Sequence, residues 1–122
     1  MPKIVLVEDE APVSGMVIDL IKMQLGEEAE VSHFTSAIKA WEYIMAHSDV
    51  QLVITDVNTE EEESMNGIEL CRAVKQAFSH VTVIVMSGRN YHLEALENGA
   101  DFYLSKPFPL AEMINAIKES LE

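Results

Sequence analysis

The sequence has little of what several protein classes require. It has 122 residues, one cysteine, and 8 Lys or Arg against 21 Asp or Glu, for a formal net charge of −13. The lone Cys71 excludes an internal disulfide and fits a reducing compartment. The electric field of this negative net charge repels nucleic acid and anionic membrane surfaces, so we expect no direct nucleic-acid binding. No apolar run approaches the ~20 residues of a membrane span, and the start turns acidic too soon for a signal peptide. We therefore expect a cytoplasmic protein without membrane insertion.

The overall composition fits one globular domain. Apolar residues make up 48% of the chain and charged residues 24%, which is ordinary for a folded protein. A chain of this length buries about two-thirds of its unfolded surface, enough for one hydrophobic core. We expect one domain over residues 1–122.

Short apolar runs alternate with segments of helical spacing. The runs predict five strands: Lys3–Val7, Glu30–Phe34, Leu52–Thr55, Val81–Met86 and Asp101–Leu104. Several of these runs are apolar at nearly every position, which is typical of strands buried on both faces. The alternation predicts an α/β fold: a doubly wound parallel sheet with helices on both sides.

Polar residues follow the predicted strands at the points where they end. Glu8 and Asp9 follow the first strand, Asp56 the third, Ser87 the fourth and Lys106 the fifth. Because right-handed crossovers bring the carboxyl ends of parallel strands to one edge, where ligands bind, we expect these side chains to lie together.

Three carboxylates at one edge need more positive charge than one lysine supplies, because each raises the pKa of the next. Oxygen ligands with room for water suit Mg²⁺, whereas the four scattered histidines lack the spacing of a zinc site. A carboxylate-bound metal beside Lys106 and Ser87 suits a phosphoryl group, whose oxygens gain charge during transfer. One carboxylate could itself be the nucleophile and form an aspartyl phosphate.

With these residues in place, the sequence resembles the receiver domain of two-component response regulators from Lys3 to Leu121. The motifs that carry the resemblance are IVLVEDE (4–10), LVITD (52–56), NGIEL (66–70), VIVMSG (83–88) and NGADFYLSKPF (98–108). The resemblance implies a flavodoxin-like fold: a five-stranded parallel sheet of order 2-1-3-4-5 with five helices. It also implies a phosphorylation-dependent signalling switch of a phosphorelay, which is not an enzyme beyond slow self-dephosphorylation.

The resemblance also implies a role for individual residues. Asp56 would accept a phosphoryl group from a sensor histidine kinase or a phosphotransfer protein, and a downstream protein target would read the result. For Mg²⁺, Asp9 and Asp56 would bind directly, Glu8 through water, and Asn58 through its backbone carbonyl.

Three further residues complete the implied switch. Lys106 would pair with one phosphoryl oxygen, and Ser87 would donate a hydrogen bond to another. Tyr103 would be the switch aromatic that turns inward when Ser87 is drawn to the phosphate. The resemblance further implies a cis peptide bond between Lys106 and Pro107.

The sequence departs from the family pattern in two places. The acidic run Glu60–Glu63 lengthens the loop after Asp56, and the stretch between Ser87 and Lys106 is short, so we expect a stunted fourth helix. We hypothesise that Arg89 meets part of the acidic run across the mouth of the site and modulates access to it. Two unrelated surface charges are the alternative.

Three other functions are the alternatives to the switch. A phosphorylation-independent interaction scaffold is compatible with the altered loop, although the intact acidic pair, Asp56, Ser87 and Lys106 argue against it. A phosphatase of the haloacid type needs an aspartate where this chain has Asn58. A flavin or dinucleotide phosphate needs a glycine- or hydroxyl-rich loop where this chain has Glu8 and Asp9, which would repel it.

Overall fold

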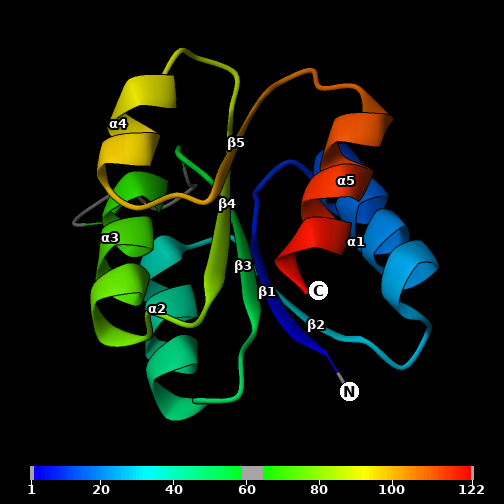
Figure 1. Cartoon of the computed structure of the whole chain (residues 1–122), viewed down its shortest axis with the longest axis horizontal. Helices are drawn as coiled ribbons and strands as arrows, with labels where there is room; N and C mark the ends of the chain where they lie inside the picture. The colour runs from blue at the N-terminus through cyan, green and yellow to red at the C-terminus, as the bar shows by residue number, and fades with distance from the viewer. Residues whose placement is uncertain (1, 59–64, 122) are drawn as a thin grey trace.

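A five-stranded parallel sheet runs through the middle of the structure, a computed structural model that describes residues 2–58 and 65–121 (Figure 1). The strands are β1 (Lys3–Val7), β2 (Glu30–Phe34), β3 (Leu52–Asp56), β4 (Thr82–Ser87) and β5 (Phe102–Ser105). They are arranged in the order β2-β1-β3-β4-β5, and every neighbouring pair is parallel. This order confirms the predicted doubly wound fold.

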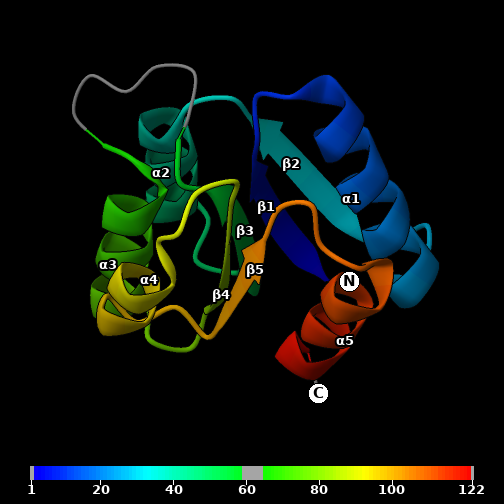
Figure 2. The same cartoon turned by 90° about the horizontal axis from the view of Figure 1, so that it is seen from above.

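Helices cover both faces of the sheet, as Figure 2 shows from above. They are α1 (Ala11–Leu25), α2 (Ala37–Ala46), α3 (Gly67–Ala77), α4 (His92–Glu97) and α5 (Leu110–Ser120). Helices α1 and α5 pack together on one face, and α2, α3 and α4 lie on the other. Within the described residues, no helix is both long and apolar enough to cross a membrane.

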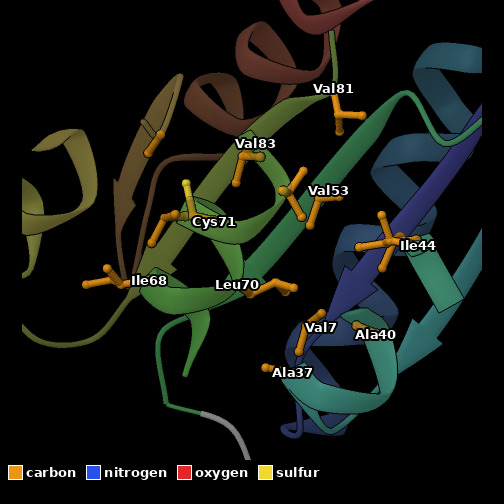
Figure 3. Close-up of a cluster of buried hydrophobic side chains, with 14 of the residues drawn as sticks. Val7, Ala37, Ala40, Ile44, Val53, Ile68, Leu70, Cys71, Val81 and Val83 are labelled. Atoms are coloured by element: carbon orange, nitrogen blue, oxygen red, sulfur yellow. The ribbon is translucent and has the colours of Figure 1, made fainter. Parts of the chain in front are cut away.

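Two hydrophobic cores lie on opposite sides of the sheet because successive strand residues point to opposite faces. In β1, Ile4 and Leu6 pack toward α1 and α5, whereas Val5 and Val7 pack toward α2 and α3. The core between the sheet and helices α2 and α3 is drawn in Figure 3, where Cys71 of α3 lies among the valines of the sheet. Burial on both faces explains why β1, β3 and β4 lack the polar alternation of a half-exposed sheet.

The helix ends follow the local sequence. The Ser36 side chain accepts a hydrogen bond from the amide of Lys39 and caps α2. Asn66 and Glu69 form a reciprocal capping box at the start of α3. The fourth helix has only six residues, which confirms the expectation that it is stunted.

Several predicted boundaries are wrong by about one residue. Strand β3 includes Asp56, and β4 and β5 each begin and end one residue later than predicted. Helix α4 begins directly after Tyr91, and Pro109 directly precedes α5. The peptide bond between Lys106 and Pro107 is cis, as the resemblance implies. The run Glu60–Glu63 lies outside the described residues.

Candidate functional site

The carboxyl edge of the sheet holds the polar residues that follow the strands. Asp56 and Ser87 are the last residues of β3 and β4, Glu8 and Asp9 directly follow β1, and Lys106 directly follows β5. Because β1, β3, β4 and β5 are parallel neighbours, these positions meet at one end of the sheet.

Three carboxylates form the centre of the site. Glu8, Asp9 and Asp56 each offer an oxygen, and these oxygens all lie within 4.8 Å of one another. Glu8 and Asp56 are buried, whereas Asp9 is exposed. Burial raises the pKa of both Glu8 and Asp56 above the ordinary values, because it removes water from the charged form, and the Lys106 ammonium only partly offsets this.

Lys106 is the cation within this cluster. Its Nζ atom lies 2.7 Å from Glu8 Oε1, 3.2 Å from Asp56 Oδ2 and 3.3 Å from Glu10 Oε1. Burial alone would lower the pKa of Lys106, but the hydrogen bond to Glu8 and the charges of Asp56 and Glu8 raise it. Lys106 is therefore a charged donor at neutral pH.

The charges of the cluster do not balance within the described residues. The carboxylates of Glu8, Asp9 and Asp56 carry three negative charges when ionised, and Lys106, which also contacts Glu10, supplies one positive charge. A divalent cation would offset the excess negative charge. The donors are all oxygen, and the adjoining cavity of about 390 Å³ is lined by Asp9, Asp56 and Asn58, so the residues present fit Mg²⁺ and its retained waters.

Backbone contacts fix Asp56 at the end of β3. The Val57 amide donates to the Met86 carbonyl of β4 at 3.1 Å, and the Gly67 amide donates to the Val57 carbonyl at 2.9 Å. Gly67 is so close that a Cβ atom there would lie 2.0 Å from the Asp56 carbonyl oxygen. Helix α3 can therefore begin directly against the phosphoacceptor candidate because residue 67 has no side chain.

Ser87 and Tyr103 are joined through the loop after β4. The Arg89 amide donates to Ser87 Oγ at 3.0 Å, and the Tyr103 hydroxyl donates to the Arg89 carbonyl at 2.6 Å. The Tyr103 oxygen also accepts from the Tyr91 amide at 3.0 Å, and the His92 ring stacks on the Tyr103 ring at 5.2 Å. Ser87 is fully buried at the end of β4.

The structure brings the predicted residues Glu8, Asp9, Asp56 and Lys106 into one cluster. Ser87 follows on the neighbouring strand, and Asn58 and Arg89 line the same cavity as Asp9, Asp56 and Lys106. The proposed partner of Arg89, the run Glu60–Glu63, lies outside the described residues.

Sequence reasoning assigned no role to two residues that touch the site. Glu10 contacts Lys106, and His33 Nε2 lies 2.7 Å from the Glu8 carbonyl oxygen, so Nε2 carries the proton of that hydrogen bond. A signal for Glu10 was present in the sequence, because it is the third acid of the Glu8-Asp9-Glu10 run. Strand β2 pairs with β1, but nothing in the sequence marks His33 as the residue that reaches Glu8.

Comparisons with known proteins agree with this geometry. A family model described as the response regulator receiver domain matches residues 4–118. The TorCAD operon transcriptional regulatory protein TorR of Escherichia coli K12 is 33% identical over 121 residues, which is 97% of this chain and 49% of TorR. Chemotaxis protein CheY1 of Helicobacter pylori is 30% identical, with 96% of this chain and 92% of CheY1 covered.

The chain spans half or less of the first curated relatives it matches, for example 8% of histidine kinase P4 of Formosa agariphila, at 34% identity. Solved structures share the fold. A response regulator receiver domain protein of Clostridium thermocellum superposes with a TM-score of 0.83 at 22% identity, covering 99% of this chain and 94% of the other. A CheY-like response regulator receiver domain protein of Methanospirillum hungatei superposes with a TM-score of 0.82 at 21% identity, covering 99% of this chain and 94% of the other.

Proposed function

Because this chain belongs to the family of response regulator receiver domains of two-component systems, we propose that it is a signalling switch that accepts a phosphoryl group on Asp56. The observation that carries the proposal is the contact between Lys106 Nζ and Asp56 Oδ2 at 3.2 Å, within the Glu8, Asp9 and Asp56 cluster. It places a nucleophilic oxygen beside a fixed positive charge and next to a set of metal ligands.

In this proposal Asp9, Asp56 and the backbone carbonyl of Asn58 hold Mg²⁺, and Glu8 holds it through water. Bound there, Mg²⁺ would neutralise charge that develops on the phosphoryl oxygens. The buried Glu8 serves a second purpose: its Oε1 holds Lys106 at 2.7 Å, and its Oε2 accepts the Glu10 amide at 3.0 Å, so it fixes the position of the ammonium.

The transfer itself is a displacement at phosphorus. A carboxylate oxygen of Asp56 forms the new P–O bond, while the P–N bond of a donor phosphohistidine breaks and its electron pair returns to the imidazole. Lys106 binds one phosphoryl oxygen and lowers the negative charge that the approaching donor meets. The Ser87 hydroxyl donates to a second oxygen, and a histidine kinase or phosphotransfer protein supplies the phosphohistidine.

The output depends on the loop between Ser87 and Tyr103. A hydrogen bond from Ser87 to the phosphoryl group draws the serine toward Asp56 and disturbs its contact with the Arg89 amide. The Tyr103 hydroxyl is bound to the Arg89 carbonyl of the same loop. When the loop moves, this hydrogen bond is lost, and the aromatic side chain is free to turn inward. A downstream protein target reads the new surface of α4 and β5.

Intact-mass measurement tests the proposal. The protein is incubated with Mg²⁺ and acetyl phosphate, and we expect the mass of one phosphoryl group to be added to the wild type but not to Asp56→Asn. Asp101→Asn is the matched control, because Asp101 lies at the opposite end of β5, where it binds Lys75.

Equal labelling of Asp56→Asn and the wild type would contradict the assignment of the acceptor. Absence of labelling in the wild type, with or without Mg²⁺, would favour the phosphorylation-independent scaffold instead.

A further inference from the structure

Glu10 is an acid at the rim of the site that contacts Lys106. The distance from Glu10 Oε1 to Lys106 Nζ is 3.3 Å, and the Glu10 side chain is 63% exposed. Glu10 precedes α1, yet its side chain forms no capping hydrogen bond with that helix. Its described contact is therefore with the ammonium, and holding the helix end is not its task.

Lys106 has a limited number of donors. An ammonium group has three N–H bonds, and Lys106 has three carboxylate neighbours, Glu8, Asp56 and Glu10. A phosphoryl oxygen that is to bind Lys106 must therefore take the place of one of these neighbours.

The three neighbours differ in how readily they can be displaced. Glu8 is fully buried and lies 2.7 Å from Nζ, so losing Lys106 would leave its charge buried and unpaired. Asp56 is the acceptor itself and stays next to the new phosphoryl group. Glu10 has the longest contact, and it returns to water when released, because exposed ion pairs are weak.

The position of Glu10 also suits this exchange. It lines the polar cavity that contains Asp9 and Asp56, and it also lines a neighbouring, mainly apolar cavity of about 400 Å³. Val13 and Phe108 line the apolar cavity, so Glu10 has open space beside it and its carboxylate can swing away from Lys106 toward water.

We propose that Glu10 is a positioning residue, which occupies the Lys106 donor that a phosphoryl oxygen later uses. The role of Glu10 rests on the proposed function. The wild-type carboxylate weakens binding of the phosphoryl group and slows phosphorylation of Asp56, which is a regulatory effect. Removing the contact increases both.

Three variants separate the contact from the charge. Glu10→Gln removes the charge and replaces the contact by a weaker one. Glu10→Asp keeps the charge but is shorter by one methylene, and we expect aspartate at this N-cap position to cap the helix instead of reaching Lys106. Asp19→Asn removes the same charge from an exposed position farther along α1.

The affinity for beryllium trifluoride, a tetrahedral mimic of a phosphoryl group on a carboxylate, is measured by ¹⁹F NMR at saturating Mg²⁺. We expect Glu10→Gln and Glu10→Asp each to lower the Kd about two- to fivefold, the size that an exposed ion pair supplies. Asp19→Asn keeps the wild-type Kd. Thermal unfolding of each variant checks that all four proteins are folded.

Wild-type affinity in Glu10→Asp, with a gain only in Glu10→Gln, would overturn the proposal, because charge alone would then explain the effect. Equal affinities in all variants would overturn it as well, and so would a failure of every protein to bind the mimic. Intact-mass labelling with acetyl phosphate is run in parallel. An unlabelled wild type refutes phosphorylation of Asp56, whereas the Kd comparison still decides the role of Glu10.

Discussion

The Tyr103 hydroxyl donates a 2.6 Å hydrogen bond to the backbone carbonyl of Arg89, and the Arg89 amide binds Ser87 on its other side. One residue of the loop after β4 thus connects the end of the site to the aromatic ring on β5. The same phenol oxygen accepts the Tyr91 amide at 3.0 Å, so two backbone groups of this loop depend on it.

The first prediction concerns this phenol. Tyr103→Phe removes both hydrogen bonds and keeps the ring that stacks on His92. We expect a loss of about 1–3 kcal/mol in the free energy of unfolding, as for two typical hydrogen bonds, and faster amide exchange at Tyr91. Hydrogen exchange followed by NMR measures the second effect.

Tyr43→Phe is the matched control, because its hydroxyl also accepts a hydrogen bond, from Ser32 at 3.1 Å, but far from this loop. It should leave exchange at Tyr91 unchanged. Unchanged exchange in Tyr103→Phe would show that the phenol does not hold the loop.

The second prediction concerns Gly67. A Cβ atom at this position would lie 2.0 Å from the Asp56 carbonyl oxygen, an atom of the backbone that has no room to move. We expect Gly67→Ala to destabilise the fold by several kcal/mol, about 3 or more, because the start of α3 must shift away from β3. Denaturant unfolding measures this loss.

Gly15→Ala in α1 is the control, because a Cβ atom there meets nothing within 4 Å. It should raise stability by about 0.5–1 kcal/mol, since alanine favours a helix over glycine. Similar effects of the two substitutions would contradict the close approach.

The sheet and the clustering of its strand-end residues follow from the sequence for a simple reason. Runs such as Leu52–Thr55 are apolar at almost every position, which is typical of strands buried on both faces. Right-handed parallel connections then bring the carboxyl ends of these strands to one edge of the sheet. The strand ends shifted by one residue because pairing fixes them: Asp56 pairs with Met86, and Ser87 with Ser105.

The contacts of exposed side chains could not be predicted in the same way. Glu10 and Lys106 are 96 residues apart, and Glu10 lies mostly in water, so no hydrophobic pattern records their meeting. The bond between Tyr103 and Arg89 likewise depends on the path of a loop. The sequence predicts where buried strands end, but it does not predict which long side chains reach each other beyond those ends.

The third prediction concerns the ion pair of Lys106 with Glu8. Lys106→Met removes the cation that pairs with a fully buried carboxylate. We expect the free energy of unfolding at pH 7 to fall by about 3 kcal/mol, as when one partner of a buried pair is lost. Adding Glu8→Gln to this variant should restore part of the loss, because the charge of Glu8 is then no longer left buried and unpaired, although Asp56 has still lost its cation.

Lys118→Met on the exposed face of α5 changes the net charge equally and should have an effect within about 0.5 kcal/mol of zero. Chemical denaturation of all four proteins provides the comparison. A double variant no more stable than Lys106→Met would contradict the pairing.

The last prediction concerns pH and Mg²⁺ together. The pKa values of Glu8 and Asp56 are raised in the folded state, chiefly by burial, so the folded protein binds protons more tightly than the unfolded chain does. Without metal, the stability that these groups contribute is fully present below their ordinary pKa values and is lost as the pH rises through the raised ones. Lys106 stays protonated over this range because its own pKa is raised.

Mg²⁺ binds the ionised carboxylates, so the stability that it adds is greater at high pH than at low pH. At pH 7.5 a concentration of ten times the Kd adds about 1.4 kcal/mol to the free energy of unfolding. Near pH 5 the increment shrinks, because protons on Glu8 and Asp56 compete with the metal. Thermal unfolding at both pH values, with and without Mg²⁺, measures the two increments.

Asp9→Asn should reduce the increment at pH 7.5, whereas the control Asp19→Asn should keep it. An equal increment at both pH values in the wild type would contradict a metal site built from the two buried acids.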